Sequence, residues 1–172
     1  MMFPQNPQEL IARAREGLGQ GVLYGLGCGG YRPDKNLGTP KCWRKPKGKI
    51  LPIYAPFLDC SGYVAWCLGR SRKPSEAFPF WLSTDSIVGD ARGRKRLFRP
   101  IPAPIPGCLA VYGDSKDSKG VAHQGHVGIV IDPAKQMVLD CSSGNGVLEH
   151  VQEVFFNGKH PTLFVVPVYF PE

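Results

Sequence analysis

Apolar residues in the first eighteen positions follow the spacing of an α-helix. Asn6 can cap such a helix, Pro7 suits its first turn, and Glu9 stands three residues after the cap. The apolar residues that follow fall on one helical face: Leu10, Ile11, Ala14 and Leu18. We therefore predict a helix from Asn6 to about Leu18, ended by closely spaced glycines.

Two further helices are predicted before the middle of the chain. Asp59 can cap a helix that begins at Cys60 and runs to about Leu68, with Val64, Cys67 and Leu68 on its inner face. The polar run 83–85 caps a short helix that continues to about residue 91.

The second half of the chain has the pattern of β-strands. Short apolar runs occupy residues 108–112, 126–131, 137–141 and 163–169, and turn residues such as Asp132-Pro133 separate some of them. Helices followed by strands are typical of an α+β fold. We expect N-terminal helices packed on an antiparallel β-sheet.

Length and composition limit the architecture. The 172 residues fit one domain, 1–172, and a hydrophobic content of 42% indicates a globular chain. Residues 32–56 contain many cations and several prolines, so we predict a basic loop insertion there, either a cleft wall or a solvated loop. A second basic cluster at 92–99 is interpreted as an exposed charged turn.

The charge and the N-terminal segment bear on location. The net charge of +7 suits polyanionic surroundings, although a solvated basic surface explains it equally well. Residues 1–8 lack the apolar core of a secretory signal, and no run is long enough to span a membrane. We expect synthesis in a bacterial or phage-infected cytoplasm, action at the cell wall or periplasm, and export by another machinery.

Six cysteines are present, and none forms a CxxC pair, so a structural zinc site is not expected. No metal and no cofactor are predicted. A disulfide between Cys28 and Cys42 and free buried thiols are both compatible with the spacing. We expect Cys67 to lie in the core, and Cys141 to point to the opposite side of its strand from Asp140.

Cys60 is the candidate nucleophile. A thiol attacks a carbonyl as the thiolate, and the first turn of a helix stabilises negative charge through its dipole and free N–H groups. The N–H groups of this turn, which includes Ser61, could also hold the oxyanion formed on attack, and Gly62 allows close backbone approach.

His126 is the candidate base. It opens an apolar strand after Gly125, whereas His123 lies in a polar loop and no comparable apolar run follows His150 or His160. A base also needs a group that orients its other ring nitrogen. Asp140 supplies one if its strand pairs with the strand of His126.

These motifs resemble a known family. The run Asp59-Cys60-Ser61-Gly62-Tyr63-Val64 resembles the nucleophile motif of NlpC/P60 cysteine peptidases, and Gly125-His126-Val127-Gly128-Ile129-Val130 resembles their histidine motif. Between them, Pro106-Gly107-Cys108-Leu109 is similar to the family's short strand motif, with Cys108 in place of its usual aspartate. The matches span about residues 58–143 in the family's order.

The resemblance implies a papain-like fold and cleavage of amide bonds in peptidoglycan stem peptides. It implies that Asp140 takes the place of the family's third polar residue, more often His, Asn or Gln, and that Tyr24 corresponds to a tyrosine assisting the oxyanion. The gap from Tyr24 to Cys60 is longer than usual in the family.

The function expected from this pattern is that of a peptidoglycan endopeptidase or amidase, a cysteine hydrolase. A single domain of this kind resembles amidase effectors of type VI secretion, which have an immunity or inhibitor protein as partner, and phage lytic enzymes. We expect no nucleic-acid partner and no integral membrane segment. Two alternatives remain: an acyltransferase or deamidase using the same cysteine and histidine, and a non-catalytic module whose basic loops bind nucleic acid or an acidic partner.

Overall fold

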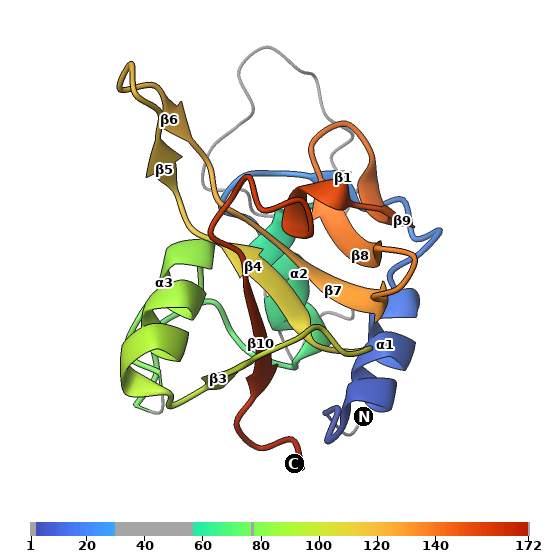
Figure 1. Cartoon of the computed structure of the whole chain (residues 1–172). Helices are drawn as coiled ribbons and strands as arrows, with labels where there is room; N and C mark the ends of the chain where they lie inside the picture. The colour runs from blue at the N-terminus through green and yellow to red at the C-terminus, as the bar shows by residue number, and fades with distance from the viewer. Residues whose placement is uncertain (1–2, 30–56, 77, 172) are drawn as a thin grey trace.

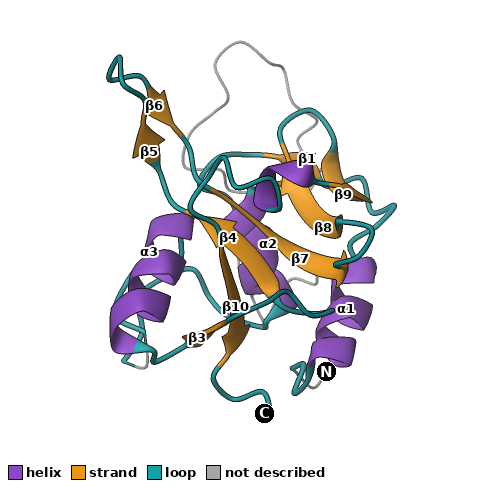
Figure 2. Ribbon diagram, viewed as in Figure 1, coloured by secondary structure: helices purple, strands orange, loops and turns teal. Residues whose placement is uncertain are grey.

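The computed structural model describes residues 3–29, 57–76 and 78–171, and the fold is α+β (Figures 1 and 2). Its centre is a six-stranded antiparallel sheet with strand order β3-β10-β4-β7-β8-β9. The strands are β3 (Phe98–Ile101), β10 (Leu163–Pro167), β4 (Leu109–Tyr112), β7 (His126–Asp132), β8 (Met137–Ser142) and β9 (Gly146–Val151).

The first helix, α1 (Pro7–Arg15), begins as the sequence predicts. The Asn6 side chain accepts a hydrogen bond from the Glu9 N–H at 2.9 Å, and Pro7 fills the first turn. Leu10 and Ala14 are fully buried, so the predicted apolar face is the packed one. The helix ends slightly before the predicted boundary.

The second helix, α2 (Cys60–Cys67), is buried along its whole length, and Asp59 caps it. Helix α3 (Thr84–Gly89) begins at a capping box between Ser83 and Ser86 and continues into a π-helical turn, η1 (Asp90–Arg94). The cations at 92, 94, 95 and 96 of the second basic cluster are exposed, as predicted, but Arg99 is half-buried in β3 and not in a turn.

The central sheet has two buried faces of different character. Odd-numbered residues, among them Val127, Ile129 and Leu139, pack against α1 and α2 in the main core. Even-numbered residues, among them Ala110, Val130 and Val138, form a smaller cluster that Phe155 of the 3₁₀ turn η2 (Glu153–Phe155) covers. Because side chains alternate along a strand, His126 and Asp140 belong to this second face.

Short strands complete the structure. Strand β1 (Leu23–Tyr24) pairs in parallel with β2 (Phe57–Leu58) just before α2. Strands β5 (Ser115–Lys116) and β6 (Ala122–His123) form a hairpin that projects from the body of the molecule (Figure 1). Across the described ranges, we find no helix with both the length and the apolarity needed to cross a membrane.

The strongly apolar strands agree with the prediction from sequence. The four predicted runs correspond to β4, β7, β8 and β10, although β10 ends at Pro167. Two strands of the central sheet were not predicted: β3 contains Arg99 and Pro100, and β9 mixes polar with apolar residues, so neither has a strong strand pattern. The two-residue strands β1, β2, β5 and β6 were not predicted either. The predicted basic loop at 32–56 lies outside the described residues.

Candidate active site

Cys60 is the first residue of α2 and borders a cleft of about 640 Å³. The cleft is lined by the β1 region, the start of α2 and the start of α3, together with residues of the loops that flank the β5–β6 hairpin. Its lining residues include Tyr24, Leu26, Gly27, Ser61, Trp81, Thr84, Asp85, Asp114 and Gln124. Cys60 is only 6% exposed, so little of its surface is open to the cleft.

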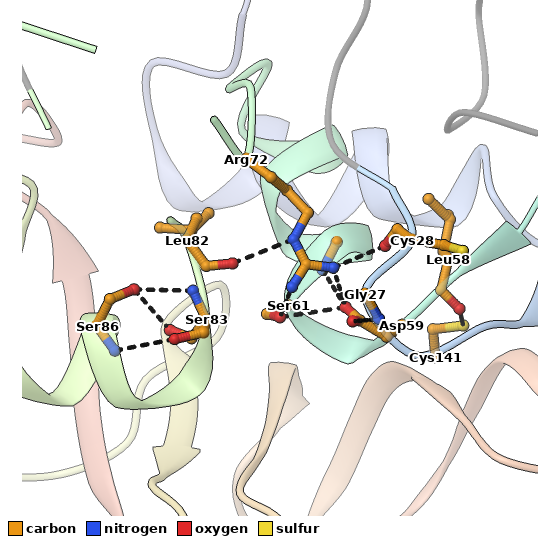
Figure 3. A network of polar contacts seen from close by, with 11 residues as sticks. Gly27, Cys28, Leu58, Asp59, Ser61, Arg72, Leu82, Ser83, Ser86 and Cys141 are labelled. Carbon is orange, nitrogen blue, oxygen red and sulfur yellow. Dashed lines mark hydrogen bonds and ion pairs between the residues drawn. The ribbon is translucent and has the colours of Figure 1, made fainter. Parts of the chain in front are cut away.

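Asp59 fixes the start of α2 through four contacts (Figure 3). Its Oδ1 accepts hydrogen bonds from the Gly62 N–H at 2.7 Å and the Ser61 hydroxyl at 3.1 Å, and its Oδ2 accepts one from the Gly27 N–H at 2.6 Å. The fourth contact is a 2.6 Å ion pair with Arg72. The cap therefore ties the nucleophile's helix to the glycine-rich segment before it.

Arg72 completes this network, and Figure 3 shows its guanidinium between three segments of the chain. Besides Asp59, it donates to the Cys28 carbonyl at 2.7 Å, the Ser61 hydroxyl at 2.9 Å and the Leu82 carbonyl at 3.2 Å. Both Arg72 and Asp59 are less than 5% exposed. A buried ion pair is tolerated when further hydrogen bonds engage its charged groups, as four bonds from Arg72 do here.

Gly62 is needed for this close packing. A Cβ atom at Gly62 would lie 2.0 Å from the Cys28 carbonyl oxygen and 2.9 Å from the Arg72 guanidinium. No side chain fits in that space. The expectation that Gly62 permits close backbone approach is confirmed.

His126 lies at the start of β7, between Cys60 and Asp140. Its Nε2 is 2.8 Å from Oδ2 of Asp140, and Cys60 lies close enough to its ring to contribute to the raised pKa of His126. Because Nε2 is engaged by the carboxylate, the nitrogen that faces the thiol is Nδ1. The ring of Phe155 stacks on the imidazole at a centroid distance of 5.5 Å and covers it.

The electrostatic contacts among Cys60, His126 and Asp140 favour a charged imidazole on His126. Burial disfavours the cationic form of His126, but hydrogen bonds to Asp140 and Cys60 outweigh burial and raise the pKa of His126 to about 10. Burial by itself would raise the pKa of Asp140. The hydrogen bond with His126 and the charge of that ring outweigh burial and hold the pKa of Asp140 below its ordinary value. An imidazolium beside Cys60 is the partner that a thiolate needs.

Asp140 has more partners than the sequence predicted. It is completely buried, its Oδ2 also accepts a hydrogen bond from the Gln152 amide at 3.0 Å, and its Oδ1 lies 3.3 Å from Nε2 of His150. The predicted contact of Asp140 with His126 is present, and the expected opposite orientation of Cys141 is also confirmed. Cys141 packs in the main core and donates to the Leu58 carbonyl at 3.3 Å.

Gly128 permits this arrangement from the neighbouring strand. A Cβ atom at Gly128 would lie 3.2 Å from Cβ of Asp140 and 2.3 Å from a methyl group of Val138. The missing side chain lets Asp140 and His126 share one face of the sheet at hydrogen-bonding distance.

The predicted oxyanion residues both border the cleft, in different situations. Burial, with the nearby charges of Cys60 and Asp59, raises the pKa of Tyr24 well above its usual range, so its hydroxyl keeps the proton that it would donate. The hydroxyl of Ser61 is engaged with Asp59 and Arg72. Within the described part of the chain, the backbone N–H groups of Cys60 and Ser61 meet no acceptor, as is usual in a first helical turn.

Two further carboxylates, Asp85 and Asp114, line the cleft. Oδ1 of Asp85 accepts a hydrogen bond from the Asp114 N–H at 2.8 Å, and Oδ1 of Asp114 accepts one from the Gly125 N–H at 2.6 Å. These bonds connect the start of α3 to the residue before His126. They help to fix the entry of the chain into β7.

Several residues of this site escaped sequence reasoning. Arg72, His150 and Gln152 stand in segments with no recognisable motif, and their partners lie 13, 10 and 12 residues away along the chain. For His150 and Gln152 the signal is weak: their spacing of two residues is that of a strand, but β9 is too polar to be recognised as one. Arg72 offers none, because its role follows from the fold of a loop.

The remaining cysteines do not enter the site. Cys67 is fully buried in the main core, as predicted, and Cys108 is fully buried in the second cluster. One of the two alternatives for Cys28 is a disulfide with Cys42, which lies outside the described residues. In residues 3–29, 57–76 and 78–171, no group of three or more acidic, histidine or cysteine side chains is arranged to hold a metal ion.

Comparisons with known proteins add no relative to this picture. A scan of protein-family models and searches of curated proteins and of solved structures returned no match to this chain. The geometry of the cleft and the motifs of the sequence are therefore the basis for a functional assignment.

Proposed function

We propose that this protein is a cysteine hydrolase of papain-like NlpC/P60 type that cleaves amide bonds in the peptides of bacterial peptidoglycan. The observation that carries the proposal is the row Cys60–His126–Asp140. A cysteine at a capped helix start interacts electrostatically with a histidine whose Nε2 is 2.8 Å from a buried carboxylate. Nucleophile, base and orienting group are the three parts that such hydrolysis requires.

The chemistry follows from these positions. The Cys60 thiolate attacks the amide carbonyl carbon, and the N–H groups at the start of α2, with the Tyr24 hydroxyl, stabilise the oxyanion. The His126 imidazolium then gives its proton to the leaving amine, which departs as the acyl-enzyme forms. Neutral His126 next accepts a proton from water, which attacks the thioester and releases the carboxylic acid product and Cys60.

The substrate class rests on the resemblance to NlpC/P60 peptidases and on surface charge. A net charge of +7 favours association with an anionic cell-wall polymer. Within this proposal, another machinery delivers the protein to the wall, as a secreted amidase effector with an immunity partner or as a phage lytic enzyme.

Digestion of purified peptidoglycan, followed by mass spectrometry of the soluble products, tests the proposal. The wild-type protein should release fragments whose mass identifies the amide bond that is cut. Cys60→Ala should release none, whereas Cys67→Ala, a matched change in the buried part of the same helix, should keep the activity. Intact peptidoglycan after treatment with folded wild-type protein would contradict the assigned substrate.

An added amine nucleophile distinguishes hydrolysis from acyl transfer. If the acyl group passes to the amine and no free acid forms, the protein is a transferase that uses the same thiol. Hydrolysis in the presence of the amine supports the proposed reaction.

A further inference from the structure

The carboxylate of Asp140 lies between two histidines that come from different strands. Strand β8, which carries Asp140, is flanked by β7 with His126 and by β9 with His150. In the β8–β9 register Leu148 is opposite Asp140 and His150 is opposite Val138, so His150 is a diagonal neighbour of Asp140 on the same face. One oxygen of the carboxylate faces His126, and the other faces His150.

Gln152 adds a third contact. Its side-chain amide donates to Oδ2, the oxygen that also faces Nε2 of His126, at 3.0 Å. Its own backbone N–H donates to the Gln136 carbonyl at 3.0 Å, which fixes the residue just after β9. Both Asp140 oxygens are thus held by side chains from β9 and its end, and the carboxylate has no freedom to rotate away from His126.

We propose that His150 and Gln152 are positioning residues that keep Asp140 ionised and aligned on His126. This inference rests on the proposed function, since it assigns the two residues to the same Cys60–His126 pair. A fully buried carboxylate with one hydrogen bond would take up a proton readily because burial disfavours its charge. Two further side-chain partners oppose that uptake, so the Asp140 carboxylate keeps its charge to lower pH.

His150 also connects the buried site with solvent. The Asp140 side chain has no exposed surface, whereas that of His150 is 26% exposed. The other titratable groups around Asp140 are Cys60 from α2, Tyr63 from α2, Tyr112 from β4 and Cys141 beside it on β8. His160 stacks on Tyr112 at a centroid distance of 4.3 Å. Of the two histidines bonded to Asp140, His150 is the one more open to solvent, at 26% against 16% for His126.

The consequence is a prediction about acid pH. Without the β9 partners, Asp140 should be protonated at higher pH and should stop supporting the His126 imidazolium there. The thiolate of Cys60 would lose its cationic partner over the same interval. The acid limb of Cys60 reactivity should therefore move to higher pH, although neither substituted residue contacts the sulfur.

Site-resolved alkylation with iodoacetamide tests this inference without any substrate. The rate at Cys60, followed by mass spectrometry of the peptide that carries it, is measured from pH 4 to pH 9. In the double variant His150→Phe with Gln152→Met, the acid limb of the Cys60 reactivity profile should shift to higher pH by about one unit. The midpoint of the ¹³C titration of the Asp140 carboxyl should shift in the same direction. His150→Gln keeps an amide donor and should restore most of the wild-type profile.

Glu149→Gln is the matched control on the same strand. Its carboxylate faces away from Asp140 and pairs with Arg15 at 3.0 Å, so its profile should match that of the wild type. A folded double variant whose profile and Asp140 titration coincide with those of the wild type would overturn the inference alone. Wild-type Cys60 that reacts no faster than free cysteine would overturn the proposed nucleophile as well.

An NMR measurement keeps the inference testable if the double variant does not fold. In the single variant His150→Phe, the ¹⁵N shifts of the His126 ring should change, because both side chains contact one carboxylate in the wild type. Unchanged shifts of the His126 ring in that variant would contradict the proposed role.

Discussion

Two buried carboxylates flank Cys60, and they have different partners. Asp59 caps α2 and is paired with Arg72, whereas Asp140 is held by two histidines and a glutamine. Arginine stays charged at every accessible pH, whereas a histidine can release and take up a proton. The Asp59 network is therefore a fixed scaffold for the nucleophile, and the Asp140 cluster is the part of the site whose charge can change during a reaction.

Loss of the Asp59–Arg72 pair and loss of Asp140 should also have different effects, the first mainly on stability and the second mainly on chemistry. Asp59 and Arg72 join the glycine-rich segment, the start of α2 and Leu82, so their loss affects the shape of the cleft. Asp140 contacts the ring of His126, so in the proposed mechanism its loss affects proton transfer first. Substitutions on the two sides should thus have different signatures in unfolding and in turnover.

The largest expected effect on turnover is that of His126→Gln. Removal of the base should lower the rate of peptide release from peptidoglycan by about 10³-fold, because neither thiol activation nor protonation of the leaving amine has another donor at hand. His123→Gln, on the exposed β5–β6 hairpin, is the control and should retain full activity. Equal activity of the two variants would remove His126 from the mechanism.

The largest expected effect on stability is that of Arg72→Met. It leaves the buried Asp59 charge without a partner and should lower the free energy of unfolding by about 3–5 kcal/mol in urea titrations. Arg70→Met, in the same loop but exposed, should change it little.

A double-variant cycle sharpens this result. Asp59→Asn with Arg72→Met should be less destabilised than Arg72→Met alone, because no unpaired charge remains. Strict additivity of the two single effects would show that the ion pair does not couple the two residues.

Asp140→Asn should affect the pH profile more than the fold. The amide can still accept a hydrogen bond from His126, but it carries no charge, so turnover at pH 8 should fall by about 10²-fold. In the wild type, the charged imidazole should persist until the pH rises through about 10, the raised pKa of His126. In the variant this alkaline limit should move down toward the ordinary histidine value, as a pH–rate profile measures.

The same pair links stability to pH with a definite sign. Since the pKa of folded His126 is raised, its contribution to stability is complete below the pKa of the unfolded histidine and is lost as the pH rises toward 10. At acid pH, the lowered pKa of folded Asp140 has the corresponding effect. The contribution of Asp140 to stability is lost as the pH falls through that pKa. The free energy of unfolding should therefore depend less on pH in Asp140→Asn than in Arg72→Met. The difference should appear both as the pH rises toward 10 and as it falls through the folded pKa of Asp140.

The smallest expected effect is that of Ser61→Ala. It removes two hydrogen bonds, to Asp59 and from Arg72, and should lower the free energy of unfolding by about 1 kcal/mol. Turnover should change by no more than a few-fold, because the backbone N–H of Ser61 remains in the first turn of α2. A large loss of turnover with unchanged stability would instead assign the hydroxyl to substrate.

The sequence by itself determined the parts of this protein that local patterns encode. The caps at Asn6, Asp59 and Ser83 mark helix starts, because a side chain three residues from a free N–H is a local relation. The four apolar runs predicted the four main strands, and the contact of His126 with Asp140 followed from the pairing of consecutive strands.

Only the tertiary structure decided what completes the site. Arg72 reaches Asp59 because a loop returns to the start of α2, and no periodicity encodes such a return. His150 and Gln152 reach Asp140 because β9 pairs with β8, although β9 is too polar to be recognised as a strand. Long-range partners of a buried charge are set by desolvation and three-dimensional fit, and these act only once the chain is folded.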